Sequence, residues 1–544
     1  MPRITAPRLA GVLGPDPQLR GRDEYHRIRT LAGRETTQMP RAVVWFKRDL
    51  RVADHAPLVE AAERGPVVGL YVHEPEVLAS PEWSPGHLAF IEDCLAELRA
   101  RLASLGSILL VRHGAMPDTL DRLHDQWRFE ELWSHEETGL AITYARDRRV
   151  AGWCRRRGVR WTERPQHGVV RPLASRDGWA GHWRRRMAPP PLPTPTSLTG
   201  PTADEMTFLA AEDVSASDVR GNAPNPMIDA QSGGETDANL VLHSFLHERG
   251  EHYQRAMSTP IEGWTACSRL SPHLAYGSLS IRTVHHATRD RIESLREEPN
   301  TGQWRRSLAS YEKRLRWHCH FIQKLEDEPE IEFRNFNRAF DGLRQEDRSC
   351  WTTEEQRRFD AWVGGRTGYP LVDACMRCLD RTGWINFRMR AMLVSFAAYH
   401  LWLHWKPVAE HLATRFLDFE AGIHYSQCQM QSGVTGINTV RIYSPVKQAA
   451  DQDPDGRFIR RWVPELADVP DEHIARPEEM PPLTQHMAGC LVGETYPAPV
   501  VDHETAYRAA KERIFDARGT SRARQEASRV YRRHGSRSRR TERR

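Results

Sequence analysis

The stretch VVWFKRDLR, residues 43–51, decides the fold of the first half of the chain, because four apolar residues run directly into a charged segment. Such a run is typical of a buried strand. Similar runs occur at 67–72 and 108–111, with a shorter candidate at 131–133. From Leu88 to Leu105, Leu and Ile recur at steps of three and four, which indicates an amphipathic helix. This alternation predicts an α/β doubly wound parallel sheet, with ligands at the carboxyl ends of its strands.

A change in composition divides the rest of the chain. Residues 186–234 contain PPPLP and then a stretch rich in Ser, Thr, Asp and Gly, which predicts a linker crossing the surface of one domain. Beyond it, apolar residues follow helical spacing and strand signatures are scarce, which predicts a large all-α domain. The predicted organisation is a basic N-terminal extension (1–40), an α/β domain (41–185), the linker, a helical domain (235–500), and a C-terminal helix with an Arg-rich tail (501–544).

The composition excludes several classes of protein. The chain has 544 residues, of which 39% are hydrophobic, and no apolar run reaches the ~18 residues of a membrane-spanning helix. The most apolar segment, Met389–Trp405, carries Arg390, His400 and His404, so we expect a core helix there. Nine cysteines, an odd number without framework spacing, indicate reduced thiols and a cytoplasmic protein.

Positive charge is concentrated at the two ends of the chain. Residues 518–544 hold eleven Arg and two Glu, and residues 1–40 hold seven Arg against four acids. An Arg-rich end attracts nucleic acid non-specifically, but a disordered solubilising tail is the favoured interpretation because the run lacks apolar residues. The rest of the chain is net negative, so any anionic partner must be held by a local basic surface.

Several short motifs do not make a site. Cys375 and Cys378 have CxxC spacing but lie in a helical pattern without a second pair, so we interpret them as core thiols. His400 and His404 lack the glutamate of a metalloprotease motif. The sequence contains neither a P-loop nor a GxSxG elbow. We therefore expect no metal site and no ordinary nucleotide-hydrolysing enzyme.

Two groups of residues in the helical half carry chemistry. SRLSP at 268–272 places hydroxyls and a cation before a predicted helix start, which suits a phosphate; a plain N-cap is the alternative. Arg388 and Arg390 lie on an aromatic-rich helix, and Asp418 and Glu420 follow about one helix later. A buried Arg–Asp pair is either purely structural or part of a cofactor site.

These residues belong to a longer pattern, through which the chain resembles the photolyase/cryptochrome family over roughly residues 42–500. The resemblance implies an N-terminal α/β domain and a C-terminal helical domain that holds FAD in a U shape. It also implies a basic surface around the FAD cavity that binds DNA. The matching stretches, in family order, are VVWFKRDLR with DHAPL (54–58), SRLSP (268–272), TGYPLVDA (367–374), TGW (382–384) and FIRRWVPEL (458–466).

The resemblance also assigns the FAD contacts residue by residue. Tyr253 and the turn of Cys267, Ser268, Arg269, Leu270 and Ser271 match positions that contact the FAD phosphates, with cysteine in place of the usual threonine at 267. Tyr311 stands where an FAD-contacting tryptophan is common. Arg390 and Asp418 match the Arg–Asp pair beside the flavin, and Glu420 takes the place of a second aspartate.

A light-driven reaction is implied by the same resemblance. In the family's repair enzymes, excited reduced FAD gives an electron to a cross-linked pyrimidine pair, the dimer splits and the electron returns. Trp317 matches the tryptophan that stacks on the flipped lesion, and Trp384 matches another aromatic near the cavity. His424 matches the residue facing flavin N5, where a neutral imidazole accepts a hydrogen bond. Trp405 and Trp351 match the middle and outer members of the photoreduction chain.

Several positions depart from the family pattern. The innermost tryptophan of the photoreduction chain is Cys428 here, so photoreduction is predicted either to use another aromatic, Trp402 or Tyr425, or to be inefficient. A glutamate that contacts the dimer in many cyclobutane repair enzymes is replaced by Arg314. Thr143 stands where a folate-antenna glutamate is expected, which leaves a second antenna chromophore unidentified.

Three functions are compatible with these observations. The leading hypothesis is FAD-dependent, light-driven repair of pyrimidine dimers in DNA by a monomeric carbon–carbon lyase of the deoxyribodipyrimidine photolyase type. The alternative is a cryptochrome-like blue-light photoreceptor without repair activity that signals to a protein partner, which His424, Cys428 and Arg314 favour. The third is a nucleic-acid-binding module with a vestigial flavin pocket, which would be colourless.

Overall fold

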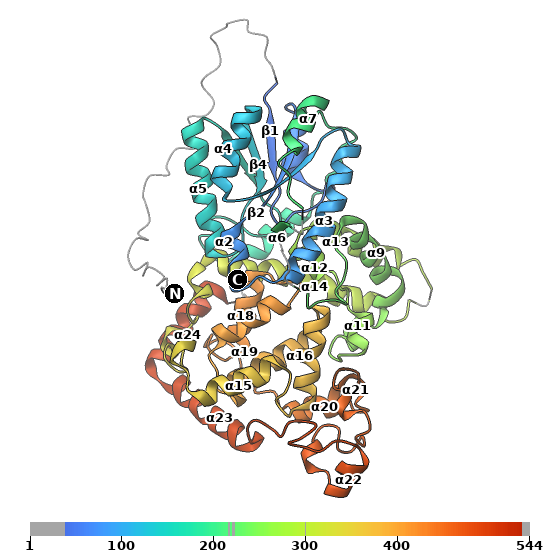
Figure 1. The fold of residues 1–544 in the computed structure, drawn as a ribbon, viewed down its shortest axis with the longest axis vertical. Coiled ribbons are helices and arrows are strands. Elements are labelled where there is room, and N and C mark those ends of the chain that lie inside the picture. The colour runs from blue at the N-terminus through green and yellow to red at the C-terminus, as the bar shows by residue number, and fades with distance from the viewer. Residues whose placement is uncertain (1–38, 216–217, 220–223, 300, 536–544) are drawn as a thin grey trace, which may run out of the picture. The chain divides into compact units, whose positions relative to one another are not determined.

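The first half of the protein folds around a five-stranded parallel sheet (Figure 1). The computed structural model describes residues 39–215, 218–219, 224–299 and 301–535. The predicted extension at 1–40, apart from its last two residues, and the tail beyond 535 lie outside these ranges. The strand order β3-β2-β1-β4-β5 shows that the chain starts in the middle and winds outward both ways. The strands are β1 (Ala42–Trp45), β2 (Val67–His73), β3 (Leu109–His113), β4 (Glu131–His135) and β5 (Arg160–Arg164).

Alternate residues of β1 face two separate cores. Ala42 and Val44 pack with α1 and α3, whereas Val43 and Trp45 pack with α4 and α5. Figure 1 accordingly shows α3 on one side of the strands and α4 and α5 on the other. The predicted doubly wound α/β domain is therefore confirmed. Its helices are α1 (Ala56–Ala62), α2 (Pro75–Leu78), α3 (Pro85–Ser104), α4 (Met116–Trp127), α5 (Ala141–Arg157) and α6 (Trp179–Met187).

The predicted linker at 186–234 follows the surface of the α/β domain. The Thr199 carbonyl accepts a hydrogen bond from the Val67 amide at 2.8 Å, at the start of β2. A helix, α7 (Ala203–Ala210), forms within the segment behind the N-cap Thr202 and packs against α4. The linker is therefore partly built into the α/β domain.

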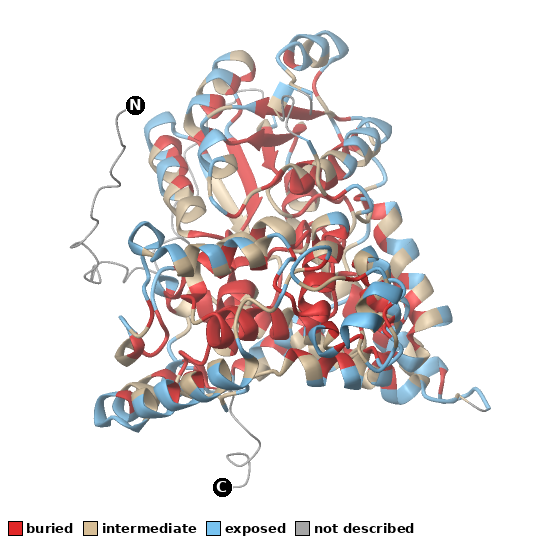
Figure 2. Ribbon diagram, turned by 60° about the horizontal axis from the view of Figure 1, so that its bottom comes forward, coloured by how far each residue is buried: buried red, intermediate tan, exposed pale blue. Residues whose placement is uncertain are grey.

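The second half of the chain is helical, as predicted. Among the described residues of this half, the only β pairing is an isolated bridge between Val492 and Tyr496. Figure 2 shows the buried residues gathered on the inner faces of these helices. The helices are α9 (Glu235–Ser244), α10 (Tyr253–Ala256), α11 (Glu262–Ala266), α12 (Ser271–Ala275), α13 (Ile281–Ser294), α14 (Trp304–Asp327), α15 (Thr353–Val363), α16 (Pro370–Thr382), α17 (Phe387–Ser395), α18 (Trp405–Arg415), α19 (Ala421–Gln431), α20 (Pro445–Gln452), α21 (Arg457–Trp462) and α22 (Pro482–Met487).

The segment predicted as one core helix, Met389–Trp405, is largely buried but divided. α17 passes into a π-helix, η6 (Phe396–His400), and the chain then turns at Trp402, whose φ is 57°. α18 begins at the end of that turn. The prediction of a single helix was therefore wrong, because apolar spacing does not report a π-turn.

The prediction of a disordered Arg-rich end is wrong for the described part of that end. α23 (His503–Gly519) lies where a C-terminal helix was predicted, and α24 (Ser521–His534), within the Arg-rich run, is also a helix, in which Val530 and His534 are buried. The Glu328 carboxylate, at the end of α14, lies 2.7 Å from His534 Nε2 and 3.3 Å from a guanidinium nitrogen of Arg529. Burial lowers the pKa of His534 to about 4, so its contact with Glu328 is a hydrogen bond at pH 7. This bond and the Arg529 ion pair hold a helix with few apolar residues, which composition alone does not reveal.

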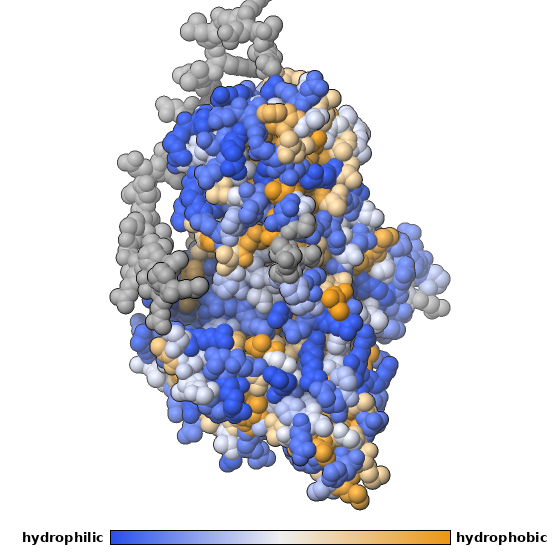
Figure 3. All heavy atoms as spheres, in the orientation of Figure 1, coloured by the Kyte–Doolittle hydropathy of each residue, from blue (hydrophilic) through white to orange (hydrophobic). Residues whose placement is uncertain are grey.

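The exterior carries no broad apolar surface in the view of Figure 3. The face shown there is mostly hydrophilic, and its hydrophobic residues form small separate groups. Within the described ranges, every helix is too short or too polar to span a bilayer.

Candidate functional site

The loop at 267–271 is fixed by an arginine from an earlier segment. The loop joins α11 to α12, and Arg269 at its centre has a φ of 60°, in the left-handed region. Arg249 donates from Nη2 to the Ser268 carbonyl at 2.7 Å and from Nη1 to the Cys267 carbonyl. Because α12 has only five residues, the cations around the loop, rather than a helix dipole, supply its positive charge.

Two tyrosines pack beside this loop. The rings of Tyr253 and Tyr311 lie 5.7 Å apart, and both contact the Phe245 ring. The Tyr311 hydroxyl is within hydrogen-bonding reach of the Ser268 side chain, and Leu270 is buried in the same core. The structure therefore brings together the residues to which the resemblance assigns the FAD phosphates.

Arg390 and Asp418 form a bidentate ion pair next to the loop. The two terminal nitrogens of Arg390, on α17, donate to the two Asp418 oxygens at 2.8 and 2.9 Å. Burial alone would raise the pKa of Asp418, but the Arg390 charge more than offsets it and the pKa is lowered. Ser271 is within hydrogen-bonding reach of the same carboxylate. An ionised Asp418 can only accept hydrogen bonds, so it suits N–H or O–H donors of a ligand.

Arg269 is a partly buried cation without a counter-ion. Its guanidinium lies between the indoles of Trp264 and Trp384, with Cζ 4.1 and 4.2 Å from the ring centroids. In the described ranges no carboxylate forms an ion pair with it, and its buried Nε has no hydrogen-bond partner. Burial lowers its pKa to about 10. A cation held this way calls for an anion, so Arg269, on the loop that Arg249 fixes, fits the diphosphate of FAD.

Glu420 faces away from the Arg390–Asp418 pair. Its carboxylate lies 3.7 Å from Arg48, and one of its oxygens is buried without a partner. Burial raises the pKa of Glu420. Glu420, Arg48 and His135 line an enclosed cavity of about 20 Å³ between the α/β domain and the helical half, with room for about one water molecule. The flavin contact expected of Glu420 stays a prediction.

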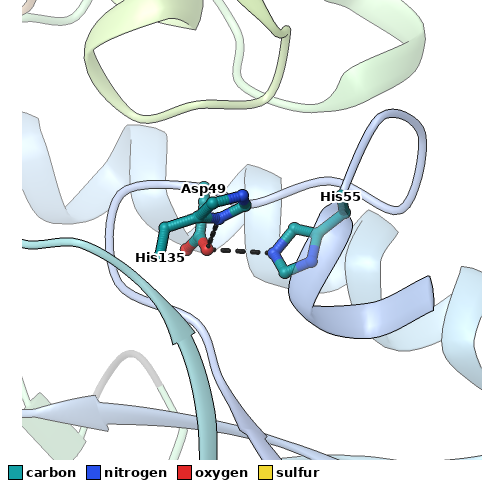
Figure 4. Close-up of side chains that lie close together, drawn as sticks. All are labelled: Asp49, His55 and His135. Atoms are coloured by element: carbon teal, nitrogen blue, oxygen red, sulfur yellow. Dashed lines mark hydrogen bonds and ion pairs between the residues drawn. The ribbon is translucent and has the colours of Figure 1, made fainter. Parts of the chain in front are cut away.

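A second buried cluster lies beside this cavity, at the carboxyl ends of β1 and β4. His55 donates from Nε2 and His135 from Nδ1 to the same oxygen of Asp49, at 2.9 and 2.6 Å, and Figure 4 shows both imidazoles turned toward it. His55 Nδ1 accepts from the Leu58 amide at 3.1 Å, as the N-cap of α1. This fixes the proton of His55 on Nε2, so that atom has no lone pair for a metal ion. We interpret the cluster as a satisfied hydrogen-bond network.

His424 is buried on α19 in a fixed tautomer. Its Nε2–H donates to the Ala409 carbonyl at 2.8 Å, which leaves Nδ1 as the acceptor. Burial lowers the pKa of His424 to about 4, so the imidazole is neutral at pH 7. Cys428 lies one turn later, with Sγ 3.7 Å from Nε2, and burial raises the pKa of its thiol. Cys428 is therefore a protonated thiol at neutral pH.

Trp317 and Phe387 are exposed near the same segment of chain. Their exposed fractions are 49% and 53%. The Arg314 guanidinium lies 4.8 Å from the Trp317 ring centroid and 3.9 Å from the sulfur of Met257, and Arg388 donates to the Ser258 hydroxyl at 3.3 Å. Within the described residues neither arginine forms an ion pair. Flat aromatic faces thus lie beside uncompensated cations.

The tryptophans assigned to photoreduction are not joined by ring contacts in the described chain. Trp405 is fully buried, and its ring centroid lies 6.0 Å from that of Tyr425. Trp351, which is half-buried, contacts the Phe359 ring at 5.3 Å instead. Their roles therefore remain predictions.

Comparison with known proteins agrees with this geometry. A family model described as DNA photolyase matches residues 42–178, and one described as the FAD binding domain of DNA photolyase matches residues 311–516. A protein named cryptochrome DASH from Gloeobacter violaceus is 30% identical, covering 87% of this chain and 95% of its own length. The chain belongs to the photolyase/cryptochrome family. The helical half of this family member therefore contains the family's FAD-binding domain.

Relatives with both family names are similar to this photolyase/cryptochrome protein. A deoxyribodipyrimidine photo-lyase from Agrobacterium fabrum is 28% identical over 86% of this chain and 96% of its own. The crystal structure of a bacterial class III photolyase from Agrobacterium tumefaciens superposes with a TM-score of 0.77 at 26% identity, covering 90% and 99% of the two chains. The predicted photolyase/cryptochrome architecture is thus confirmed.

Sequence reasoning missed several residues around the site. Arg249 anchors the loop and Trp264 completes the stack on Arg269, but neither stands in a local motif. Asp49 does lie in the strand-end stretch 43–51, where ligands of such sheets are expected. The signal in the sequence was a charged residue just after a strand. His55 and His135, which hydrogen-bond to Asp49, lie outside that stretch.

Proposed function

We propose that this protein repairs pyrimidine dimers in DNA with light, using reduced FAD bound in its helical half. FAD supplies the light-driven electron. The protein would hold it through Arg269, whose charge would face the diphosphate on the loop that Arg249 fixes, and through the Arg390–Asp418 pair, which would orient the polar edge of the ring system. His424 presents a neutral acceptor at Nδ1.

The observation that carries the repair proposal is the exposed indole of Trp317. An unstacked base needs a flat apolar face, and stacking on an aromatic side chain contributes about 1–3 kcal/mol per base. Arg314 lies at that indole and Arg388 at Ser258, both without carboxylate partners in the described chain, so they suit the phosphates that flank a flipped nucleotide. The DNA partner and a monomeric state are part of this proposal.

The test is illumination of the reduced protein with oligonucleotides carrying either a cyclobutane or a (6-4) dimer. We expect light-dependent loss of one lesion, and Trp317→Ala to weaken damaged-DNA binding about 10- to 100-fold, since stacking is lost. Phe333→Ala, at an aromatic 56% exposed elsewhere on the helical half, is the matched control. No light-dependent loss of either lesion would contradict the proposal.

A photoreceptor without repair activity is the second candidate. Arg314 places a cation over the indole where many cyclobutane repair enzymes have a glutamate, and Cys428 is a thiol in place of an inner tryptophan. The relative from Gloeobacter violaceus is named a cryptochrome. This candidate predicts a yellow protein whose flavin is photoreduced while both lesions persist, and whose light and dark forms differ in partner binding. A colourless protein that cannot take up FAD would support the third, vestigial-pocket interpretation.

A further inference from the structure

Tyr425 is a buried phenol that faces a carboxylate from the α/β domain. Its side chain on α19 is fully buried, and its hydroxyl donates to Oε1 of Glu82, which is also buried. Burial is the main factor that raises the pKa of Tyr425, and Glu82 raises it further, so the phenol stays protonated. Glu82 is therefore placed to accept the phenolic proton of Tyr425 when the ring is oxidised.

Lys406 places a positive charge beside the Tyr425 ring, so the ring must lose its proton together with the electron. Lys406 Nζ lies 3.1 Å from the Tyr425 oxygen and 4.3 Å from the ring centroid. Positive charge on the ring would be repelled by that ammonium group. Loss of the proton with the electron leaves a neutral ring, which Lys406 does not oppose. Lys406 also keeps Glu410, 3.4 Å away, as a carboxylate partner after Glu82 becomes neutral.

Tyr425 lies between the flavin side of the domain and Trp405. Its ring is 5.5 Å from His424 and 6.0 Å from Trp405. His424 in turn contacts the Phe416 ring, which stacks on the guanidinium of Arg390 in the Arg390–Asp418 pair. This series of contacts connects the Arg390–Asp418 pair to the Trp405 indole through Tyr425, whose hydroxyl donates to a buried carboxylate.

The neighbouring candidates are worse electron donors. Arg344 and Arg513 place guanidinium carbons 4.4 and 4.9 Å from the Trp402 ring centroid, and these charges disfavour a cation on that ring. Cys428 is a protonated thiol, and the nearby His424 Nε2 is itself a donor to Ala409. Neither side chain has a base placed to take a proton.

We propose that Tyr425 is the immediate electron donor to light-excited oxidised flavin and that Glu82 takes its proton. The phenolic O–H bond breaks, one electron passes to the flavin and the proton passes to Glu82 Oε1, leaving a neutral tyrosyl radical and a neutral carboxylic acid. An added thiolate then gives one electron to the tyrosyl radical, which takes its proton back from Glu82, and two of the thiyl radicals so formed couple to a disulfide. The inference rests on the proposed function insofar as both need bound FAD.

Illumination of the oxidised, FAD-loaded protein without oxygen tests this directly. We expect the visible absorption band and the hyperfine-split EPR spectrum of a neutral tyrosyl radical, and protein grown with ring-deuterated tyrosine should show a collapsed hyperfine pattern. Tyr425→Phe should remove the signal and slow flavin photoreduction by about tenfold or more. Glu82→Gln keeps the hydrogen-bonding shape without the base and should lower the yield of the radical.

Two matched variants serve as controls. Tyr399→Phe removes a buried tyrosine hydroxyl that has no hydrogen-bond partner in the described structure, and Trp402→Phe removes the rival aromatic. Both should leave the radical signal and the photoreduction rate unchanged. FAD content and reduction by dithionite in the dark are measured on every variant, so that lost flavin is not mistaken for a lost donor.

The outcomes separate this inference from the repair proposal. A fully loaded Tyr425→Phe protein that photoreduces at the wild-type rate overturns the inference, as does a wild-type radical that is unaffected by tyrosine deuteration. A tyrosyl signal without repair of either lesion counts against repair alone. A wild-type protein that takes up no FAD overturns both proposals.

Discussion

Two arginines, one in each half of this protein, are held in opposite ways. In the α/β domain, Arg146 is surrounded by acids: it lies 2.8 Å from Glu74 and 2.8 Å from Asp147, and it also pairs with Glu137. In the helical half, Arg269 lies between two indoles and has no carboxylate partner in the described chain. We interpret the compensated charge of Arg146 as part of a structural network and the unpaired charge of Arg269 as the place of a ligand.

The largest expected effect comes from removing the cation of the compensated network. Arg146→Met leaves three carboxylates near one another with less positive charge, so the free energy of unfolding of the apoprotein should fall by about 3–5 kcal/mol. Urea unfolding measures this, with Arg148→Met, at an exposed position of the same helix, as control. A loss below ~1 kcal/mol would show that the network is not a structural one.

For Arg269 we expect the reverse: its removal should lower the affinity for FAD and should not lower the stability of the apoprotein. Arg269→Met removes a cation that has no carboxylate partner in the described chain, so FAD affinity should fall by about 1.5–3 kcal/mol, roughly 10- to 100-fold. The apoprotein should be equally stable or more stable. Flavin fluorescence titration and urea unfolding are the measurements, and Arg461→Met, at an arginine 5.3 Å from the Trp462 ring centroid, is the control. Loss of apoprotein stability with unchanged FAD affinity would reverse the assignment.

A third prediction concerns pH and the Asp49 cluster. Burial lowers the pKa of His135 to about 3, so between pH 6.5 and 3 the unfolded chain binds more protons than the folded one. The free energy of unfolding should therefore rise with pH across that window. His135→Gln should make the slope shallower by up to ~1.4 kcal/mol per pH unit. Unfolding at a series of pH values checks this, and exposed His486→Gln should not change the slope. Equal slopes for wild type and His135→Gln would contradict it.

The smallest effect is expected at His424. Because its pKa is about 4, the spectrum of bound flavin should show no histidine titration between pH 5 and 8. His424→Asn should shift the photoreduction spectrum by a small amount that does not vary with pH in that range. A wild-type step near pH 6.5, absent from the variant, would show that His424 is more accessible to water than its burial indicates.

The parts of the fold that could be predicted are those encoded by local apolar patterns. The runs at 43–46 and 67–72 became β1 and β2 because central strands of a parallel sheet are apolar on both faces. The edge strand β5 was missed, since Arg160–Arg164 alternates charged residues with few apolar ones and is only partly buried. Docking of α24 was missed because Glu328, which fixes it, is remote in sequence.

The sequence predicted which residues belong to the site, but it did not predict the direction in which each side chain points. The Arg390–Asp418 pair formed as expected, because complementary charges on adjoining elements leave few arrangements. Glu420 is two residues from Asp418, yet its carboxylate lies beside Arg48 of the other half. Side-chain direction depends on packing between distant segments. The contact between Tyr425 and Glu82 arises in the same way and could not be read from the sequence near either residue.

The contacts of Glu328 with α24 fasten that helix to α14, the helix that also carries Tyr311 and Trp317. A fluorescent reporter or affinity tag fused to the C-terminus would, through α24 and Glu328, load the helix that carries Tyr311 and Trp317. Fusions for cell imaging or immobilisation on a sensor chip should therefore be designed with a long flexible spacer at this end.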